Sequence, residues 1–320
     1  MNTPLVTIWT TTYNHAPFIR QCLEGILMQK TTFSFELLIH DDASTDETAD
    51  IIREYEARYP NIVKPIYQTE NLFSKGGGIT RKFLLPRSQG KYIAACEGDD
   101  YWTDPLKLQK QIEFLESHPD YTICGGMYWI LEEGKSEPIE RDWFVREMAK
   151  FPKGKTVTLD NFLYPYSLQF LTVCFLKDCY DVEKIKQISY AKDDTCYAVF
   201  LEQGKGFIFP DYFGVYRLHQ GGIWAGKISE EQVRSNEKCY GQLVQFFGNK
   251  SKSIRKAYFD TCISLRVIEL KKSKHPVMEY LKMMRFAFSG NILDVISFQV
   301  PFFLRTSIES FIRYCKKNNK

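Results

Sequence analysis

GKYIAACEGDDYW, residues 90–102, places three carboxylates directly after an apolar, strand-like run. The carboxylates are Glu97, Asp99 and Asp100, and Gly98 stands among them. Like charges gathered at the end of a strand repel one another unless a positive group binds there. A glycine beside three acids suggests oxygens that converge on a hard divalent cation. The stretch therefore predicts a site where Mn²⁺ or Mg²⁺ holds a substrate diphosphate.

Strand-like and helix-like segments alternate through the first third of the chain. We expect strands at residues 5–11, 35–40, 63–68 and 91–96, and helices at residues 17–29, 46–58 and 104–117. Ser44 and Glu47 have the spacing of a capping box at the start of the second helix. This alternation predicts a mostly parallel sheet covered by helices on both faces.

The rest of the chain divides into a mixed middle and a helical end. Strand-like text covers residues 121–131, 170–176 and 206–218, with a helix near 194–203, and the sequence beyond Gly226 is helical and basic. We therefore expect an α/β domain with a mixed, mostly parallel sheet over residues 1–222. A helical, basic C-terminal region would follow over residues 223–320.

Composition indicates a globular protein with an uneven charge. Of 320 residues, 44% are hydrophobic and 25% are charged, and the net charge is +3. From Lys250 onward there are 15 Lys/Arg and 5 Asp/Glu, a net charge of +10, which leaves −7 for the rest. A basic end favours phosphate-bearing partners such as anionic lipid, nucleic acid or a phosphorylated substrate.

Cysteine usage and the N-terminus both favour a cytoplasmic location. The nine cysteines form no CxxC pair, and free buried thiols are the expectation. The first 15 residues lack the basic and apolar regions of a signal peptide, and no apolar run reaches the roughly 18 residues of a membrane span. We expect a cytoplasmic protein, with the basic end as a candidate for peripheral attachment to the inner face of the membrane.

Three polar clusters follow strand-like segments, at residues 10–14, 41–46 and 97–100. Ligands of open α/β sheets bind where strands end at their carboxyl edge. The competing interpretation is that these acids only cap helices, and it is the stronger one for Asp46 and Asp104. Helix capping explains the cluster at 97–100 less well, because one cap needs only one acid.

Together these motifs resemble an inverting family-two glycosyltransferase of the GT-A fold. The resemblance rests on TTYN, LLIHDDASTDET, ENLFSKGGGITRKFLL, GKYIAACEGDDYW and DPLKLQKQIEFL, which occur in the family's order and spacing between residue 4 and about residue 222. It implies a UDP-sugar donor at the carboxyl edge of the sheet. It also implies a saccharide or lipid-linked acceptor and a role in bacterial polysaccharide synthesis, with no nucleic-acid partner.

The resemblance implies a donor site, residue by residue. Thr11, Tyr13 and Asn14 would line the base and ribose pocket, and Asp42 or Asp41 would contact the uracil or its ribose. Phosphates, metal and sugar would meet a further set of residues: Asn71, Arg81, Glu97, Gly98, Asp99, Trp102 and Arg217.

The implied metal ligands are Asp99, Asp100 and His219. The family's Asp-x-Asp motif reads Glu97-Gly98-Asp99 here, so the first acid is one methylene longer than usual. His219 lies in YRLHQGG, where two glycines suit a loop that closes over the donor.

The implied general base lies at the start of the helix near residue 194. Asp194 is the first candidate and Asp193 the second. One carboxylate suits inverting transfer, because it takes the acceptor proton while that oxygen attacks the anomeric carbon. An ordinary acid at a helix N-terminus is the competing interpretation.

Other functions fit the sequence less well. SKGGGITRK (74–82) lacks the lysine-serine ending of a P-loop, and no GxGxxG follows the first strand. A sugar nucleotidyltransferase would open with a glycine-rich basic loop. The nonenzymatic alternative is a degenerate sugar-nucleotide-binding protein or a membrane adaptor. The C-terminal region either packs as helices or lies on an anionic leaflet.

Overall fold

The computed structural model describes residues 3–163, 168–222 and 230–272. The chain forms two compact units, Met1–Lys227 and Ile228–Lys320. The boundary expected after residue 222 falls at the edge of a segment outside the described residues. Of the candidate membrane-associating region 223–320, residues 273–320 also lie outside the described residues. In the second unit, α7 (Glu230–Phe247) packs on α8 (Lys252–Lys272), so the described part is helical as expected. No helix of the described residues is both long and apolar enough to cross a membrane.

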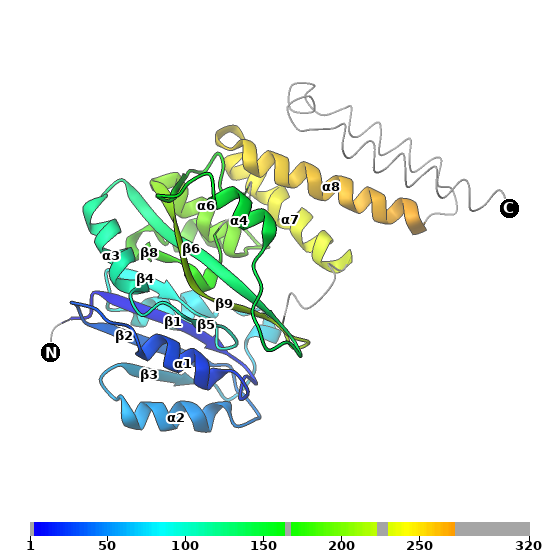
Figure 1. Ribbon diagram of the computed structural model, residues 1–320. Helices are drawn as coiled ribbons and strands as arrows, with labels where there is room; N and C mark the ends of the chain where they lie inside the picture. Colours follow the sequence, from blue (N-terminus) through cyan, green and yellow to red (C-terminus); the bar gives the residue numbers. More distant parts are fainter. Residues whose placement is uncertain (1–2, 164–167, 223–229, 273–320) are drawn as a thin grey trace. The chain divides into compact units, whose positions relative to one another are not determined.

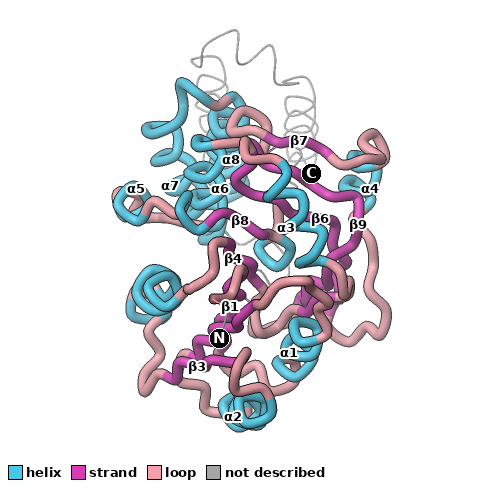
Figure 2. The backbone as a smooth tube through the Cα atoms, turned by 90° about the vertical axis from the view of Figure 1, so that its left-hand side faces the viewer, coloured by secondary structure: helices cyan, strands magenta, loops and turns pink. Residues whose placement is uncertain are grey.

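The first unit is built on one mixed sheet (Figure 1). Its strands in the described residues are β1 (Val6–Thr12), β2 (Phe35–Asp41), β3 (Val63–Tyr67), β4 (Tyr92–Ala95), β5 (Tyr101–Trp102), β6 (Tyr121–Glu132), β7 (Lys155–Val157), β8 (Cys174–Leu176) and β9 (Lys205–Leu218). The order across the sheet is β3-β2-β1-β4-β8-β6-β9-β5, and β7 pairs with β9. Figure 2 shows β3, β1, β4 and β8 following one another in this order. The α/β fold class is confirmed.

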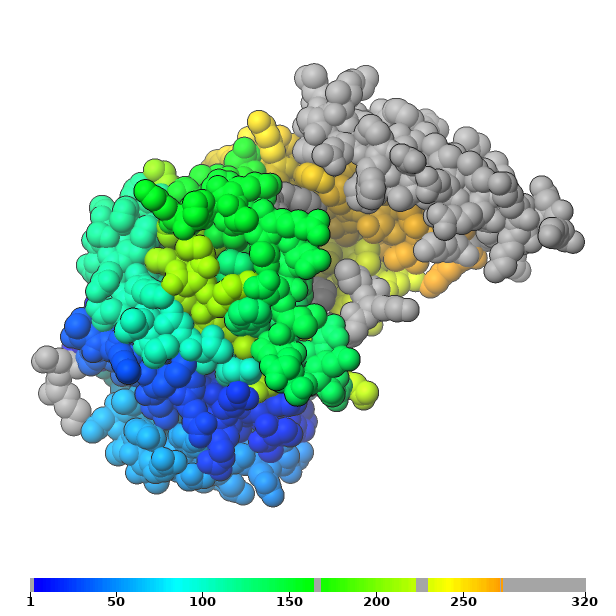
Figure 3. All heavy atoms as spheres, in the orientation of Figure 1, coloured from blue at the N-terminus to red at the C-terminus, as the bar shows by residue number. Residues whose placement is uncertain are grey.

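The α-helices of the first unit are α1 (Ile19–Leu27), α2 (Thr48–Arg58), α3 (Lys107–Ser117), α4 (Asp142–Met148), α5 (Val182–Lys186) and α6 (Asp193–Gln203). β1, β2, β3 and β4 are parallel, and Val6, Ile8 and Trp9 are buried, because both faces of such strands are covered. In Figure 3 the blue and green atoms of this unit form one continuous surface.

The strand order predicts a ligand-binding crevice at the carboxyl edge of the sheet. From β1 the chain moves to β2 and β3 on one side, while β4 joins β1 on the other side. The loops that follow β1 and β4 therefore diverge, and such a switch point is where open α/β sheets bind ligands. β8 is antiparallel to both β4 and β6, and β9 is parallel to β6. The carboxyl end of β9 consequently lies at the same edge as those of β1 and β4.

Several local predictions were wrong or incomplete. Residues 170–172 form a 3₁₀ turn, so that only 174–176 of the expected strand 170–176 pairs in the sheet. The capping box of Ser44 and Glu47 does not form, because the Ser44 hydroxyl donates to Asp41 instead. Asp46 takes the capping role, and its Oδ1 accepts the Thr48 backbone N–H at 3.0 Å.

Candidate active site

Three loops at the carboxyl edge of the sheet meet around the acidic stretch 97–100. One loop follows β1, the acidic loop follows β4, and the third follows β9. The backbone N–H of Gly98 donates to Thr11 at 3.0 Å, which ties the acidic loop to the end of β1. The backbone N–H of Arg217, at the end of β9, donates to Asp100 Oδ1 at 2.8 Å. The crevice predicted by the strand order therefore contains the acids that the sequence singled out.

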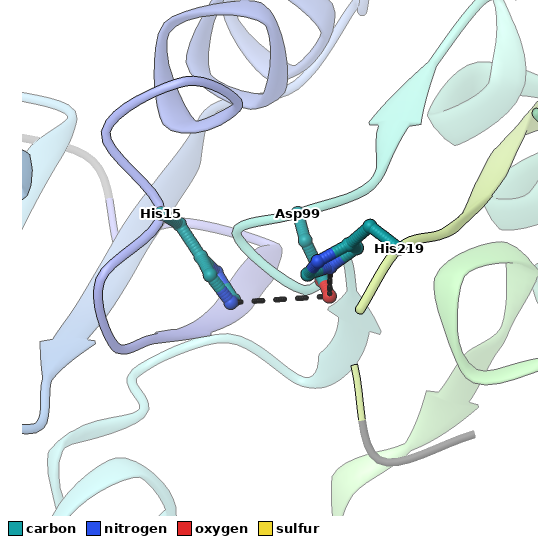
Figure 4. Close-up of side chains that lie close together, drawn as sticks. All are labelled: His15, Asp99 and His219. Carbon is teal, nitrogen blue, oxygen red and sulfur yellow. Dashed lines mark hydrogen bonds and ion pairs between the residues drawn. The ribbon is translucent and has the colours of Figure 1, made fainter. Parts of the chain in front are cut away.

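Asp99 lies between two histidines, His15 and His219 (Figure 4). His219 Nε2 is 3.1 Å from Asp99 Oδ2, and His15 Nε2 is 3.9 Å from the same oxygen. The side chains of His15, Asp99 and His219 are 17%, 19% and 10% exposed, so all three are reachable but largely desolvated. Burial acts to raise the pKa of Asp99, but the His219 hydrogen bond and the nearby His15 lower it on balance. Asp99 is therefore an anion with two imidazoles beside it.

Glu97 and Asp100 add negative charge to the same loop. Ligand atoms of Glu97, Asp99 and Asp100 lie within 4.8 Å of one another. Burial, followed by the charges of Asp99 and Asp193, raises the pKa of Glu97 to about 8. Burial and the charges of Asp99 and Glu97 also raise the pKa of Asp100. Asp100 Oδ2 is buried and has no hydrogen-bond partner in the described part of the chain. These carboxylates and imidazoles are a donor set that fits Mn²⁺ or Mg²⁺.

Gly98 permits the close approach of the loops after β1 and β4. A Cβ atom on Gly98 would lie 2.7 Å from Thr12 Oγ1 and 3.0 Å from His15 Nδ1. Real Cβ atoms are not found so close to other heavy atoms, so any larger residue would displace His15 or Thr12. The glycine therefore sets the distance between Asp99 and His15.

Arg217 is hydrogen-bonded to the acidic loop. Its guanidinium donates to the backbone carbonyl of Asp99 and to Gln21 Oε1. The same group lies 5.1 Å from the Phe18 ring centroid and 4.5 Å from that of Tyr101. The guanidinium of Arg217 therefore makes hydrogen bonds through its N–H groups and also contacts two aromatic rings. Through these contacts Arg217 positions the acidic loop. The phosphate contact expected for Arg217 stays a prediction.

Asp193 and Asp194 begin α6, and their surroundings differ. Asp194 is 9% exposed, whereas Asp193 is exposed. Although Asp193 faces solvent, the surrounding protein partly desolvates its carboxyl group. This desolvation, with the neighbouring charge of Asp194, raises its pKa to about 6. The electrostatic effect of Asp193 on Glu97 also indicates that it lies near the acidic loop. Asp193 is therefore the more accessible of the two candidate acids, and the assignment of the base stays a prediction.

A family model described as Glycosyl transferase family 2 matches residues 7–174, more than half of the chain. The chain belongs to glycosyl transferase family 2. The matched segment contains all of β1 except Val6, the whole of β4 and the whole acidic loop. Asp193, Arg217 and His219 lie beyond the matched segment.

Relatives of this family member include proteins of known and unknown role. It is 35% identical to the uncharacterized protein Rv1520 of Mycobacterium tuberculosis over 221 residues, which is 68% of this chain but only 60% of the relative. It is 27% identical to WfaP of Escherichia coli, named a UDP-Glc:alpha-D-GlcNAc-diphosphoundecaprenol beta-1,3-glucosyltransferase, over 72% of this chain and 84% of that protein.

The fold is similar to that of TarS from S. aureus, solved in complex with UDP. The two structures superpose with a TM-score of 0.56 at 16% identity, covering 90% of this chain and 76% of that chain. At this identity the likeness shows the fold alone, which is the GT-A fold expected from the sequence motifs.

In this family member, the residues expected at the nucleotide base border two adjoining loops. Tyr13 is 41% exposed, so its ring is free to contact a ligand. Asn14 has a positive φ of 55°, and its side-chain oxygen accepts the Thr45 N–H at 2.7 Å. Thr11 is half-buried at the end of β1. These contacts hold the loop after β1 against the loop after β2.

Asp41 and Asp42 are both buried and face neighbouring backbone and side chains. Burial raises the pKa of Asp41, whose carboxylate accepts the Ser44 hydroxyl. Both oxygens of Asp42 accept backbone N–H groups, from Leu72 and Phe73, at 2.9 Å each. Asp42 therefore fixes the position of the segment around residue 72.

Asn71 and Arg81 belong to that neighbouring segment. Asn71 Oδ1 accepts the Ser74 N–H at 2.8 Å and closes a turn. Arg81 is half-buried in a π-helical turn, Thr80–Leu84, and its guanidinium lies beside Gly78. Their contact with nucleotide or phosphate stays a prediction.

Trp102 does not take the place expected for a residue that packs against the sugar. It is 1% exposed, and its indole N–H donates to the Leu171 carbonyl at 2.7 Å. Lys107 Nζ lies 4.0 Å from the ring centroid. The ring is thus part of the core under the acidic loop, where it anchors β5.

Three residues of the site were missed by sequence reasoning: His15, Phe18 and Gln21. Each follows β1, and the Phe18 ring lies 4.7 Å from the His219 ring. Phe18 and Gln21 carry no recognisable signal because their roles depend on Arg217, about two hundred residues away in the chain. His15 did carry a signal, since it directly follows the TTYN motif at a strand end.

Proposed function

We propose that this glycosyltransferase moves a sugar from a UDP-sugar to a saccharide or lipid-linked acceptor, with inversion, in the synthesis of a bacterial surface polysaccharide. One observation carries the proposal. An acidic and imidazole cluster at the switch point of the sheet lies near an exposed carboxylate, Asp193, at the start of α6. The name of WfaP and the UDP in the TarS structure favour this donor and this kind of acceptor.

The two parts of the site have complementary tasks in an inverting displacement. Asp193 takes the proton of an acceptor hydroxyl while that oxygen attacks the anomeric carbon and the bond to the diphosphate breaks. A single displacement at that carbon inverts its configuration. Asp99 and His219, with Glu97 or Asp100, would hold Mn²⁺ or Mg²⁺, which supplies positive charge to the departing diphosphate.

The pKa of Asp193 suits a general base. A base is most effective when its pKa lies near the working pH, since it is then both largely ionised and strong enough to take a proton. The value of about 6 meets this condition better than an ordinary aspartate would.

Turnover of UDP-sugars tests the proposal directly. A panel of UDP-sugars with Mn²⁺ and candidate acceptors should give UDP release, and Asp193→Asn should lower kcat by roughly 10²–10⁴ while UDP still binds. Asp178→Asn is the matched control, because Asp178 is an exposed aspartate outside the crevice and should leave kcat unchanged.

Two results would count against the proposal. UDP that binds without being released from any donor would favour the degenerate sugar-nucleotide-binding protein. Near-normal turnover by Asp193→Asn would move the base to another residue, with Asp194 the next to test.

A further inference from the structure

The loop after β1 brings a second imidazole to the acidic crevice. His15 Nε2 lies 3.9 Å from Asp99 Oδ2, and His219 Nε2 lies 3.1 Å from the same atom. The ligand atoms of all three residues lie within 4.8 Å of one another. In Figure 4 both rings point to the carboxylate of Asp99 from opposite loops.

These distances match those between ligands of a single ion. A metal–nitrogen bond is about 2.0–2.1 Å, so two ligand atoms of one ion lie no more than about 4.2 Å apart. Both distances to Asp99 are within that limit. The ligand nitrogens of the two imidazoles lie at most 4.8 Å apart. A shift of less than about 1 Å by one ring would bring both nitrogens within bonding distance of one ion.

The surroundings of His15 favour the tautomer with its proton on Nδ1, which leaves the Nε2 lone pair available to a metal ion. A metal-ligating histidine keeps its proton on the other nitrogen, where a hydrogen-bond partner fixes the tautomer. His15 Nδ1 and Thr12 Oγ1 are both buried without a hydrogen-bond partner in the described ranges. Both atoms approach the point that a Cβ of Gly98 would occupy. A hydrogen bond from Nδ1–H to the Thr12 hydroxyl or to a bound water would hold the proton on Nδ1.

We propose that Asp99, His219 and His15 together bind the divalent metal, so that the protein holds it before any nucleotide arrives. The inference rests on the proposed function, because it concerns the metal of the same site. Two imidazoles and one carboxylate suit Mn²⁺ or Co²⁺ better than Mg²⁺, which prefers an octahedron of oxygens. The site is therefore selective for the softer ions.

Binding of the metal alone tests this ligand set. Mn²⁺ titrated into the nucleotide-free protein and followed by electron paramagnetic resonance should bind, and His15→Gln should weaken its affinity at least about tenfold, since even the loss of a residue that only supports a ligand costs 10–100-fold. His118→Gln is the matched control, because His118 is exposed at the end of α3 and should leave the affinity unchanged.

A second measurement on the unmodified protein removes any dependence on how the variant folds. Electron spin-echo modulation from ¹⁴N should report two imidazoles on the bound Mn²⁺, and an equal concentration of Mg²⁺ should fail to displace that ion. One imidazole, unchanged affinity in His15→Gln, or displacement by Mg²⁺ would each overturn the proposal.

UDP release measured on the same samples separates the two proposals. A protein that binds Mn²⁺ through His15 but turns over no UDP-sugar would refute the proposed function and leave the ligand set standing. Normal turnover with a Mn²⁺ affinity that does not depend on His15 would do the reverse.

Discussion

At the scale of single residues, Asp193 and Asp194 are adjacent aspartates that differ in burial. Asp194 is nearly enclosed, so an acceptor hydroxyl could not reach it without local opening. Asp193 remains accessible, and its partly desolvated carboxylate holds a proton more tightly than a free aspartate. Accessibility and basicity therefore coincide on one residue.

The raised pKa of Asp193 predicts an acid limb in the rate profile. The base must be ionised to act, so kcat/KM should fall about tenfold per pH unit below about pH 6 and level off above it. The measurement is kcat/KM for UDP release between pH 5 and 8 at saturating metal. An ordinary aspartate would place the limb near pH 4, and a flat profile across pH 5 to 7 would contradict the assignment.

At the scale of elements, Asp42 joins the end of β2 to the segment around residue 72. Its two carboxylate oxygens accept the backbone N–H groups of Leu72 and Phe73, which lie about 30 residues beyond β2 in the chain. Hydrogen bonds to a charged acceptor contribute about 1.5–3 kcal/mol each. The orientation of the segment that carries Asn71 therefore depends on one buried carboxylate.

Asp42→Ala should release this segment. We expect faster hydrogen exchange at the amides of Leu72 and Phe73, and weaker UDP binding, because the pocket wall is no longer fixed. Asp50→Ala, on an exposed face of α2, is the control and should change neither. Unchanged exchange at these two amides would show that other contacts hold the segment.

Elements with a strong local pattern could be predicted from the sequence. β1, β2 and β4 are short, mostly buried runs of strand length, and these three strands and α6 were predicted within about two residues. β5 and β7 are too short for a pattern, and their pairing with β9 is decided by distant residues. The acidic site was predictable because its residues are consecutive, whereas the contribution of His15 depends on a loop approach that only Gly98 allows.

At the scale of the whole molecule, charge is segregated along the chain. Residues from Lys250 onward have a net charge of +10, while the preceding part has −7. A basic end beside aromatic segments is typical of proteins that lie on anionic leaflets, where each Lys or Arg contributes up to about 1 kcal/mol. A lipid-linked acceptor would be met at such a surface.

This segregation predicts reversible membrane binding. The full chain should co-sediment with anionic liposomes at low salt and dissociate at high salt, because screening weakens exposed charge attraction. A chain shortened to about residue 250 should lose that binding and keep its affinity for UDP, provided that the removed part is not needed for folding. Neutral liposomes are the control, and a full chain that ignores anionic liposomes would leave helix packing as the role of the basic end.

Asp99 and the two histidines beside it, His15 and His219, are widely separated in the chain. During synthesis, the three acids of the stretch 97–100 exist long before β9 inserts between β6 and β5 and brings Arg217 and His219 to them. Contacts of such long range form late in folding, since a large loop must close first. A nascent or truncated chain that lacks β9 therefore carries the family's acidic motif but lacks the Arg217 and His219 contacts that complete the site.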